Sequence, residues 1–148
     1  MAIPNVVSVS SIYGTTVVSV LTTTLTTTQV TAASDKVHKI NLIRCANITD
    51  SDATVTFDIE VSGTHKMLAN EVTVPANSVV DIIDKNSSVY LQETDLIRGG
   101  ASAGTTIDCV ISYEIMDDAY ENNLWLLHIL DDTLQEEFGR LMTLQVTF

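Results

Sequence analysis

The stretch Ala53-Thr-Val-Thr-Phe-Asp-Ile-Glu-Val-Ser-Gly63 decides how this chain folds. Apolar side chains occupy every second position of the stretch, and polar or charged side chains occupy the positions between them. The apolar set is Val55, Phe57, Ile59 and Val61. Because successive side chains of a β-strand point to opposite faces, this alternation predicts a strand with one dry face and one solvated face.

A second stretch, residues 106–116, has the same alternation. Val110 is the one apolar residue at an otherwise polar position, and the apolar positions are Ile107, Cys109, Ile111, Tyr113 and Ile115. We therefore expect both stretches to be core strands that other strands cover. The side chains predicted to point inward are Val55, Phe57, Ile59, Ile107, Cys109, Ile111 and Tyr113.

The rest of the chain up to residue 116 is also typical of β structure. Segments 37–48 and 53–62 predict a hairpin, and 37–48 either is buried on both faces or contains a bulge near Leu42. The threonine run Thr22–Thr28 favours a solvent-facing edge strand, and Gly99–Gly104 favours a flexible loop. Further strands are expected at 5–12 (ended by Tyr13-Gly14), 15–32, 72–74, 79–83, 89–91, 95–97 and 105–116. About eight strands with turns between them predict an all-β fold, an antiparallel β-sandwich or jelly roll.

Composition narrows the choice of partners. The chain has 148 residues, of which 45% are apolar and 18% charged, which suits one folded domain with a core. Its net charge of −12 comes from 19 acidic against 7 basic residues. That field repels nucleic acids and anionic membranes, so neither is an expected partner. The first residues do not resemble a signal peptide, and no apolar run approaches the length of a membrane span.

The hydrophobic period changes after residue 116. Asp118 and Glu121 are typical of a helix start, and leucines then follow at a spacing of three or four residues. The last residues alternate again, which predicts a terminal strand. We divide the chain into an N-terminal arm or short strand (1–14), a β-sandwich domain (15–116) and a C-terminal helical and strand segment (117–148).

The C-terminal segment has two interpretations. It folds back on its own sheet, or it is an assembly arm that binds a neighbouring subunit. We favour the arm, because a sandwich complete by residue 116 has little need of another 30 residues. Large residues carry most of the energy of such contacts, so Trp125 and Phe148 are the predicted anchors. The predicted assembly contacts are Trp125, Leu127, Leu130, Leu134, Phe138, Leu141, Val146 and Phe148.

Candidate catalytic and metal-binding residues are scattered along the chain. His38, His65 and His128 lie far apart and share no ligand spacing. Asp50-Ser-Asp52 has oxygens for calcium but lacks the rest of a calcium loop, so we expect it to cap a turn. Four carboxylates would suit acid–base chemistry but are expected to be solvated: Asp58, Glu60, Asp95 and Glu114.

The two cysteines, Cys45 and Cys109, lie within apolar strand patterns, where buried, reduced thiols are expected. Whether a disulfide joins them stays open, because their spacing in the sequence does not decide it. No nucleophile motif or phosphate-binding glycine loop is present. We therefore expect no enzymatic activity, no cofactor and no metal.

Several motifs in succession resemble a known family. They are Thr22-Thr-Thr-Leu-Thr-Thr-Thr28, Ile40-Asn-Leu-Ile-Arg-Cys-Ala-Asn47, Ala53-Thr-Val-Thr-Phe57, Val74-Pro-Ala-Asn77, Tyr90-Leu-Gln-Glu-Thr-Asp-Leu-Ile-Arg98 and Ile111-Ser-Tyr-Glu-Ile115. Over residues 15–116 this succession resembles a small β-sandwich module among the virion structural proteins of tailed bacteriophages. The segment from Asp117 onward departs from that pattern, since such modules usually end near the Ser-Tyr-Glu-Ile strand.

The resemblance implies a non-enzymatic subunit that decorates or stabilises the capsid, or that belongs to the neck or tail. The implied partners are other virion proteins and further copies of the same chain in a homo-oligomer. The implied location is the virion, assembled in the host cytoplasm. The alternative is a carbohydrate-binding β-sandwich module used in attachment to the host surface. Such modules usually present exposed aromatic side chains, whereas the one tryptophan here lies in the predicted C-terminal helix.

Overall fold

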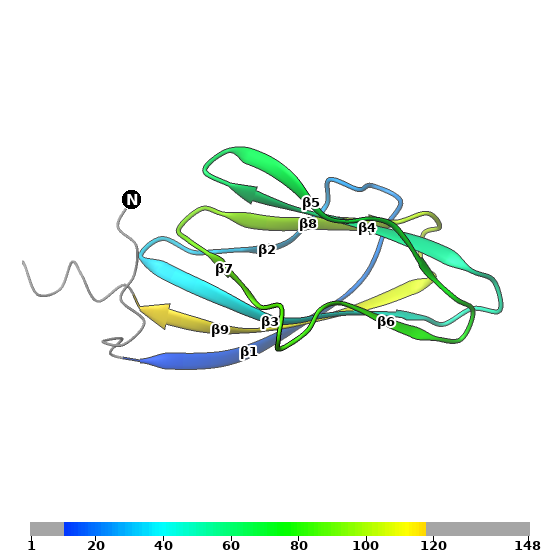
Figure 1. Cartoon of the computed structure of the whole chain (residues 1–148), viewed down its shortest axis with the longest axis horizontal. Coiled ribbons are helices and arrows are strands. Elements are labelled where there is room, and N and C mark those ends of the chain that lie inside the picture. The colour runs from blue at the N-terminus through cyan, green and yellow to red at the C-terminus, as the bar shows by residue number, and fades with distance from the viewer. Residues whose placement is uncertain (1–10, 118–148) are drawn as a thin grey trace, which may run out of the picture. The chain divides into compact units, whose positions relative to one another are not determined.

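The computed structural model describes residues 11–117, which form nine β-strands in two antiparallel sheets (Figure 1). Within these residues there is no helix, so the all-β prediction is confirmed for this part of the chain. The helix and terminal strand predicted beyond Asp117 lie outside the described residues. The strands are β1 (Ile12–Val20), β2 (Thr28–Thr31), β3 (Lys36–Asn47), β4 (Ala53–Val61), β5 (Thr64–Val74), β6 (Val79–Ile83), β7 (Val89–Leu91), β8 (Leu96–Ala101) and β9 (Ile107–Asp117).

The strand order is nested. Sheet A has the order β1-β9-β3-β6, with β7 also paired to β3, and sheet B has the order β2-β8-β4-β5. The first strand therefore lies beside the last, and the second lies beside the last but one. The chain passes between the sheets at most of its connections (Figure 1). This order is the one found in jelly rolls, and it is consistent with the predicted β-sandwich.

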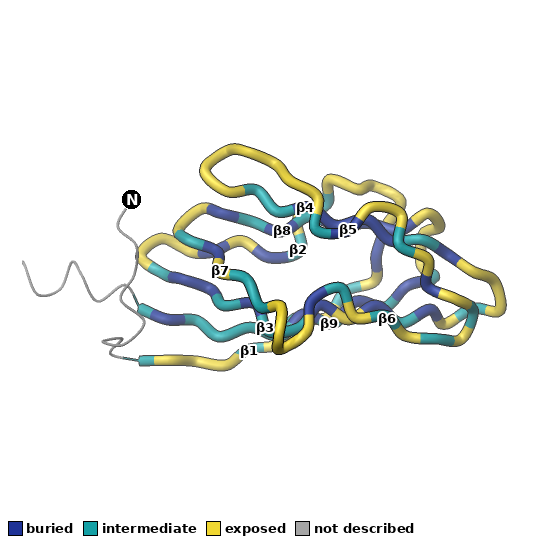
Figure 2. The backbone as a smooth tube through the Cα atoms, viewed as in Figure 1, coloured by how far each residue is buried: buried dark blue, intermediate teal, exposed yellow. Residues whose placement is uncertain are grey.

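One hydrophobic core is built from both sheets, and Figure 2 shows buried segments along their facing sides. Five of the side chains predicted to point inward are buried: Val55, Phe57, Ile107, Cys109 and Ile111. Ile59 and Tyr113 are partly buried and pack against this core. The core prediction is therefore confirmed.

The predicted hairpin of 37–48 and 53–62 is wrong, because β3 belongs to sheet A and β4 to sheet B. The buried amide of Asn47 shapes the crossing between them. Its Nδ2 donates to the carbonyl oxygens of Ser51 (2.8 Å) and Val74 (3.0 Å), and its Oδ1 accepts from the Thr49 N–H (3.0 Å). These bonds fold 48–52 into an arch. The bulge predicted near Leu42 is confirmed by a register shift against β9 at this place.

The threonine run is a connection between sheets rather than an edge strand. β1 continues through Tyr13-Gly14, where a break was predicted, and ends at Val20. The chain then runs along β8, where the Thr22 and Thr27 carbonyl oxygens accept from the N–H groups of Ala101 (2.9 Å) and Gly99 (3.0 Å). The run therefore connects β1 of sheet A to sheet B, and its backbone carbonyl groups bind β8. The strand propensity of threonine did not reveal this role.

The flexible loop predicted at Gly99-Gly100 is wrong, because both glycines are buried in β8. A Cβ on Gly99 would lie 2.4 Å from the Cδ1 and Cε1 atoms of Phe57. A Cβ on Gly100 would lie 2.8 Å from the Thr22 carbonyl oxygen. The two glycines thus make room for the ring of Phe57 on one strand and for the threonine run.

β5 is longer than the predicted strand at 72–74, since it begins at Thr64. It forms a hairpin with β4 through Ser62-Gly63, where φ is 51° and 77°. Glu71 has a positive φ of 49°, and the pairing with β4 shifts register twice. These irregularities interrupt the alternation from which a strand is predicted.

Candidate functional site

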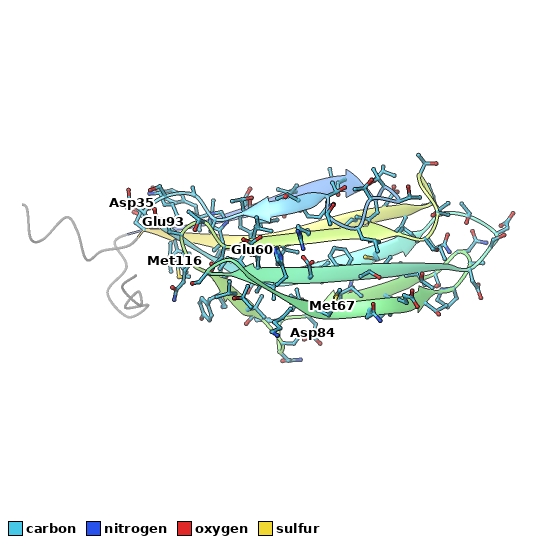
Figure 3. The ribbon with its side chains drawn as sticks, turned by 90° about the horizontal axis from the view of Figure 1, so that it is seen from above. Asp35, Glu60, Met67, Asp84, Glu93 and Met116 are labelled. Carbon is cyan, nitrogen blue, oxygen red and sulfur yellow. The ribbon has the colours of Figure 1, made fainter. Side chains whose placement is uncertain are left out.

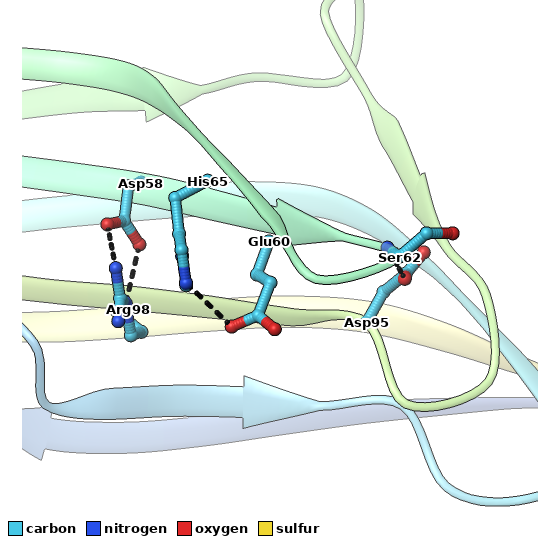
Figure 4. A network of polar contacts seen from close by, with 6 residues as sticks. All are labelled: Asp58, Glu60, Ser62, His65, Asp95 and Arg98. Atoms are coloured by element: carbon cyan, nitrogen blue, oxygen red, sulfur yellow. Dashed lines mark hydrogen bonds and ion pairs between the residues drawn. The ribbon is translucent and has the colours of Figure 1, made fainter.

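A group of charged contacts lies on neighbouring strands of sheet B (Figure 4). Asp58 on β4 lies directly opposite Arg98 on β8, and both side chains are mostly buried. The prediction that Asp58 is solvated is therefore wrong. Arg98 donates from Nε to Oδ1 (2.9 Å) and from Nη2 to Oδ2, so the pair is bidentate. The hydrogen bond to Asp58 raises the pKa of Arg98. The carboxylate is thus held by a permanent cation, which ill suits a general acid or base.

A second pair lies beside the first. Glu60, two residues along β4, lies opposite His65 on β5, with 3.2 Å between Oε2 and Nε2. The imidazole is 40% exposed, and the contact is an ion pair when His65 is protonated. Both pairs follow the strand register, and such cross-strand pairs contribute about 0.2–1 kcal/mol each. Residues 11–117 contain no group of three His, Cys, Asp or Glu side chains placed to hold a metal ion.

Asp95 was expected to be solvated, and this is wrong, because only 2% of it is exposed. Its Oδ1 accepts from the Ser62 N–H at 3.0 Å (Figure 4). Its Oδ2 accepts from the Gln92 N–H, also at 3.0 Å. The side chain thereby ties the β4–β5 hairpin turn to the turn before β8. It is a buried structural acceptor, and sequence gave no sign that two distant turns meet there.

Asp50 and Asp52 are also engaged in turns. Asp52 Oδ1 accepts from the Ala76 N–H (2.9 Å), and Asn77 Nδ2 donates to Asp50 Oδ1 (2.8 Å). The two aspartates therefore bridge the arch after β3 to the turn between β5 and β6. This geometry supports the predicted turn-capping role.

The two cysteines are register partners on β3 and β9, and both are free and buried. A hydrogen bond between the thiols, together with burial, raises the pKa of Cys45 well above its usual range. A thiol that is buried and protonated is a poor nucleophile. The prediction that both thiols are buried is confirmed.

His38 is buried and stacks on Tyr113, with 4.9 Å between ring centroids and 22° between ring planes. Its Nδ1 atom has no hydrogen-bond partner among residues 11–117, and burial lowers the pKa of the imidazole. The neutral ring therefore behaves as an aromatic core residue. His38 and His65 lie on different sheets and do not converge, while His128 lies outside the described residues.

Acidic side chains gather at the end of the domain where β9 finishes. Figure 3 shows Asp35 and Glu93 at this end, close to Met116. Two ion pairs neutralise other acids of the same region: Lys36 with Asp117 (2.5 Å) and Lys39 with Glu114 (3.5 Å). Glu114 was expected to be a solvated carboxylate, but it is only partly exposed and has a cross-strand partner.

A different kind of surface lies along β1. Among the described residues, β1 pairs only with β9, so its other side is an open sheet edge. Four of its apolar side chains are at least half exposed: Ile12, Tyr13, Val18 and Val20. A shallow groove of about 530 Å³ lies between β1 and β9, and its lining residues are Val18, Ser19, Val20, Asp108, Cys109 and Val110. Open strand edges with apolar side chains are typical places for another chain to bind. We call this surface the β1 edge.

The residues predicted to make assembly contacts are not placed by the structure. Trp125, Leu127, Leu130, Leu134, Phe138, Leu141, Val146 and Phe148 all lie outside the described residues. The candidate surface that the structure adds is the β1 edge. Its composition was visible in the sequence, but its position at the border of a sheet was not.

Comparison with known protein families and curated proteins found no match, so function is inferred from the fold and from these contacts. No protein-family model matches the chain, and no curated protein matches it in sequence. Residues 11–117 contain no helix long and apolar enough to cross a membrane.

Proposed function

We propose that the protein is a non-enzymatic structural subunit of a tailed-phage virion. It assembles in repeated copies that decorate or stabilise the capsid, or it belongs to the neck or tail. The observation that carries the proposal is the succession of motifs over residues 15–116 that resembles a phage virion module. Its motifs from Ile40 to Asn47 and from Ala53 to Phe57 fall on core strands β3 and β4.

The use of polar groups supports a structural role. On sheet B, Asp58 pairs with Arg98 and Glu60 with His65. Asp95 accepts hydrogen bonds from two backbone N–H groups. The thiols are buried. An enzyme needs convergent polar groups that are free to meet a substrate. A subunit that works by protein contacts needs instead a stable domain with an apolar surface on which to bind.

The proposed attachment device is the predicted C-terminal segment 117–148, whose first residue, Asp117, is the last residue of β9. Asp118 and Glu121 begin a helix with a leucine stripe, and a strand near the C-terminus follows. Trp125 and Phe148 are its anchors. Deleting residues 118–148 should leave the β domain folded and abolish attachment to the particle. A truncated chain that unfolds would contradict this, since the segment would then be part of the core.

Electron microscopy of particles tests the proposal directly. Immunogold label against this chain should appear at repeated positions on the shell, neck or tail. Particles that remain unlabelled, while the soluble fraction of the same lysate contains the protein, would overturn the proposal.

The alternative, a carbohydrate-binding module, would need exposed aromatic side chains, and two tyrosines of the described residues, Tyr13 and Tyr90, are exposed. They lie toward opposite edges of sheet A, because β9 and β3 separate β1 from β7. At the usual strand spacing of about 4.8 Å, three steps place them roughly 14 Å apart. Two rings so far apart do not form one stacking platform for a sugar. Selective binding on a glycan array would favour this alternative over the virion role.

A further inference from the structure

The β1 edge differs from every other sheet edge of the described residues. β2 has four residues and an irregular register with β8. β5 carries charged side chains and shifts register against β4. β6 and β7 share one side of β3 and are separated by a turn in which Asp84 Oδ1 accepts from the Asn86 N–H (2.9 Å). Short strands, charges and irregularities are the devices that keep edges from pairing.

β1 has none of these devices. It runs for nine residues in unbroken register with β9, and it contains no charged residue and no proline. Strands of this kind readily pair with another strand. An edge without such devices, in a sheet whose other edges have them, is a candidate surface for binding another strand.

The net charge of the chain limits where two copies can bind each other. Two copies of a chain with a net charge of −12 repel each other unless they meet where few acids are free. β1 is uncharged, and two nearby acids on β9, Glu114 and Asp117, are paired with Lys39 and Lys36. A third, Asp108, lies opposite Val20 and has no ion pair among the described residues. The β1 edge therefore brings one unpaired acid of β9 from each copy to the contact and no charge of its own.

We propose that the β1 edge binds the β1 edge of a second copy, antiparallel and across a two-fold axis. The two A sheets then form one continuous sheet. The register that uses all nine residues places Ile12 opposite Val20 of the second copy, Gly14 opposite Val18, and Thr16 opposite itself. An antiparallel edge pair is self-complementary, as an interface between identical subunits with two-fold symmetry requires.

The side chains of β1 fit this register. A small residue, Gly14, faces Val18, the most exposed large apolar side chain of β1. Thr16 forms a Thr–Thr pair of the kind that stabilises antiparallel strands. Ile12 of the second copy comes to the groove at Val18, Val20 and Val110. In the isolated domain, 56% of Ile12 and 72% of Val18 are exposed. Pairing therefore covers apolar surface that is otherwise in water.

This inference rests on the self-assembly in the proposed function but not on the virion role. It is tested with purified full-length protein and no particles, so the two can fail separately. A dimer formed by a protein absent from virions would overturn the proposed function alone.

The first experiment measures mass by light scattering over a range of concentrations. The wild-type chain should be a dimer, and Val18→Lys should weaken dimerisation by about tenfold or more, since it places charge in the apolar contact. Val79→Lys is the matched control, because Val79 is a 54% exposed valine on β6. It should dimerise as the wild type does. A monomer at every concentration, or equal dimerisation of Val18→Lys and the wild type, would overturn the proposal.

The second experiment tests the register by cross-linking. Under oxidised glutathione, two Thr16→Cys chains should form one intermolecular disulfide, as their two thiols are oxidised and glutathione is reduced to two thiols. Asn86→Cys, in an exposed turn, should give no such dimer. Amide hydrogen exchange should show protection of β1 that is lost in Val18→Lys. Protection that instead depends on residues 118–148 in a monomeric protein would identify that segment as the occupant and overturn the proposal.

Discussion

The contact between Gly99 and Phe57 yields the sharpest stability prediction. An alanine Cβ at position 99 would lie 2.4 Å from two ring atoms of Phe57 and 3.0 Å from a third. The ring is fully buried, so it has no solvent-facing position to move to. Forcing an extra methyl group into a packed core costs about 1–3 kcal/mol. Gly99→Ala should destabilise the domain by this amount through steric overlap.

The partner substitution isolates the contact. Phe57→Ala should cost about 3–5 kcal/mol, the usual range for removing a buried phenylalanine ring. In that background the cavity accepts the methyl group of Gly99→Ala. The double variant should therefore be more stable than the sum of the single effects predicts, with a coupling of about 0.5–3 kcal/mol.

The assay is equilibrium denaturation in urea, with thermal melting as a second readout. For a domain of this size, 1 kcal/mol corresponds to a shift of about 4 °C or more. Gly104→Ala is the matched control, because a Cβ there would meet one side-chain atom at 3.8 Å. That variant should stay within about 0.5 kcal/mol of the wild type. Full stability of Gly99→Ala, or strict additivity in the double variant, would refute the proposed packing.

Three further predictions concern buried polar groups. Burial lowers the pKa of His38 below its usual 6.5, so the unfolded chain binds a proton more readily than the folded one. Stability should be complete above pH 6.5 and fall as the pH drops below it, and His38→Phe should flatten this slope in a pH series of urea melts. Asp95→Ala should cost about 1–3 kcal/mol for each backbone N–H that loses its acceptor, whereas exposed Glu93→Ala should change urea stability by at most about 0.5 kcal/mol. Cys45 and Cys109 should resist Ellman's reagent in native buffer and react fully in denaturant; reaction at the rate of a free thiol without denaturant would contradict their burial.

Local alternation was enough to predict the central strands. β4 and β9 have one apolar face each, and their inward side chains could be identified because a strand period of two is visible in a short window. The bulge near Leu42 was also predictable, since a change of phase within one apolar strand has few other causes. These features depend on neighbours in sequence.

The predictions that were wrong concern residues whose contacts are with residues distant in the sequence. Nothing local distinguishes a hairpin from an arch between two sheets, and the arch after Asn47 is shaped by a bond to Val74. Glycines usually mark loops, yet Gly99 is required by a ring from another strand. Asp95 resembled a solvated acid because its two donors come from separate turns.

The sequence predicted only part of the β1 edge. The lack of charge in Ile12–Val20 could be seen in the sequence, but its position at the border of sheet A follows from the nested strand order. The assembly residues predicted from Trp125 to Phe148 remain a prediction, since they lie outside the described residues.

Quantitative mass spectrometry of purified particles tests the central claim most directly. The claim is that this chain is a repeated structural subunit of a tailed-phage virion. Its peptides should copurify with the major capsid protein in a fixed ratio through successive density gradients, as expected of many copies per particle. A chain that is abundant in the lysate but absent from purified particles, or whose ratio to the capsid protein falls with each gradient, would contradict the claim.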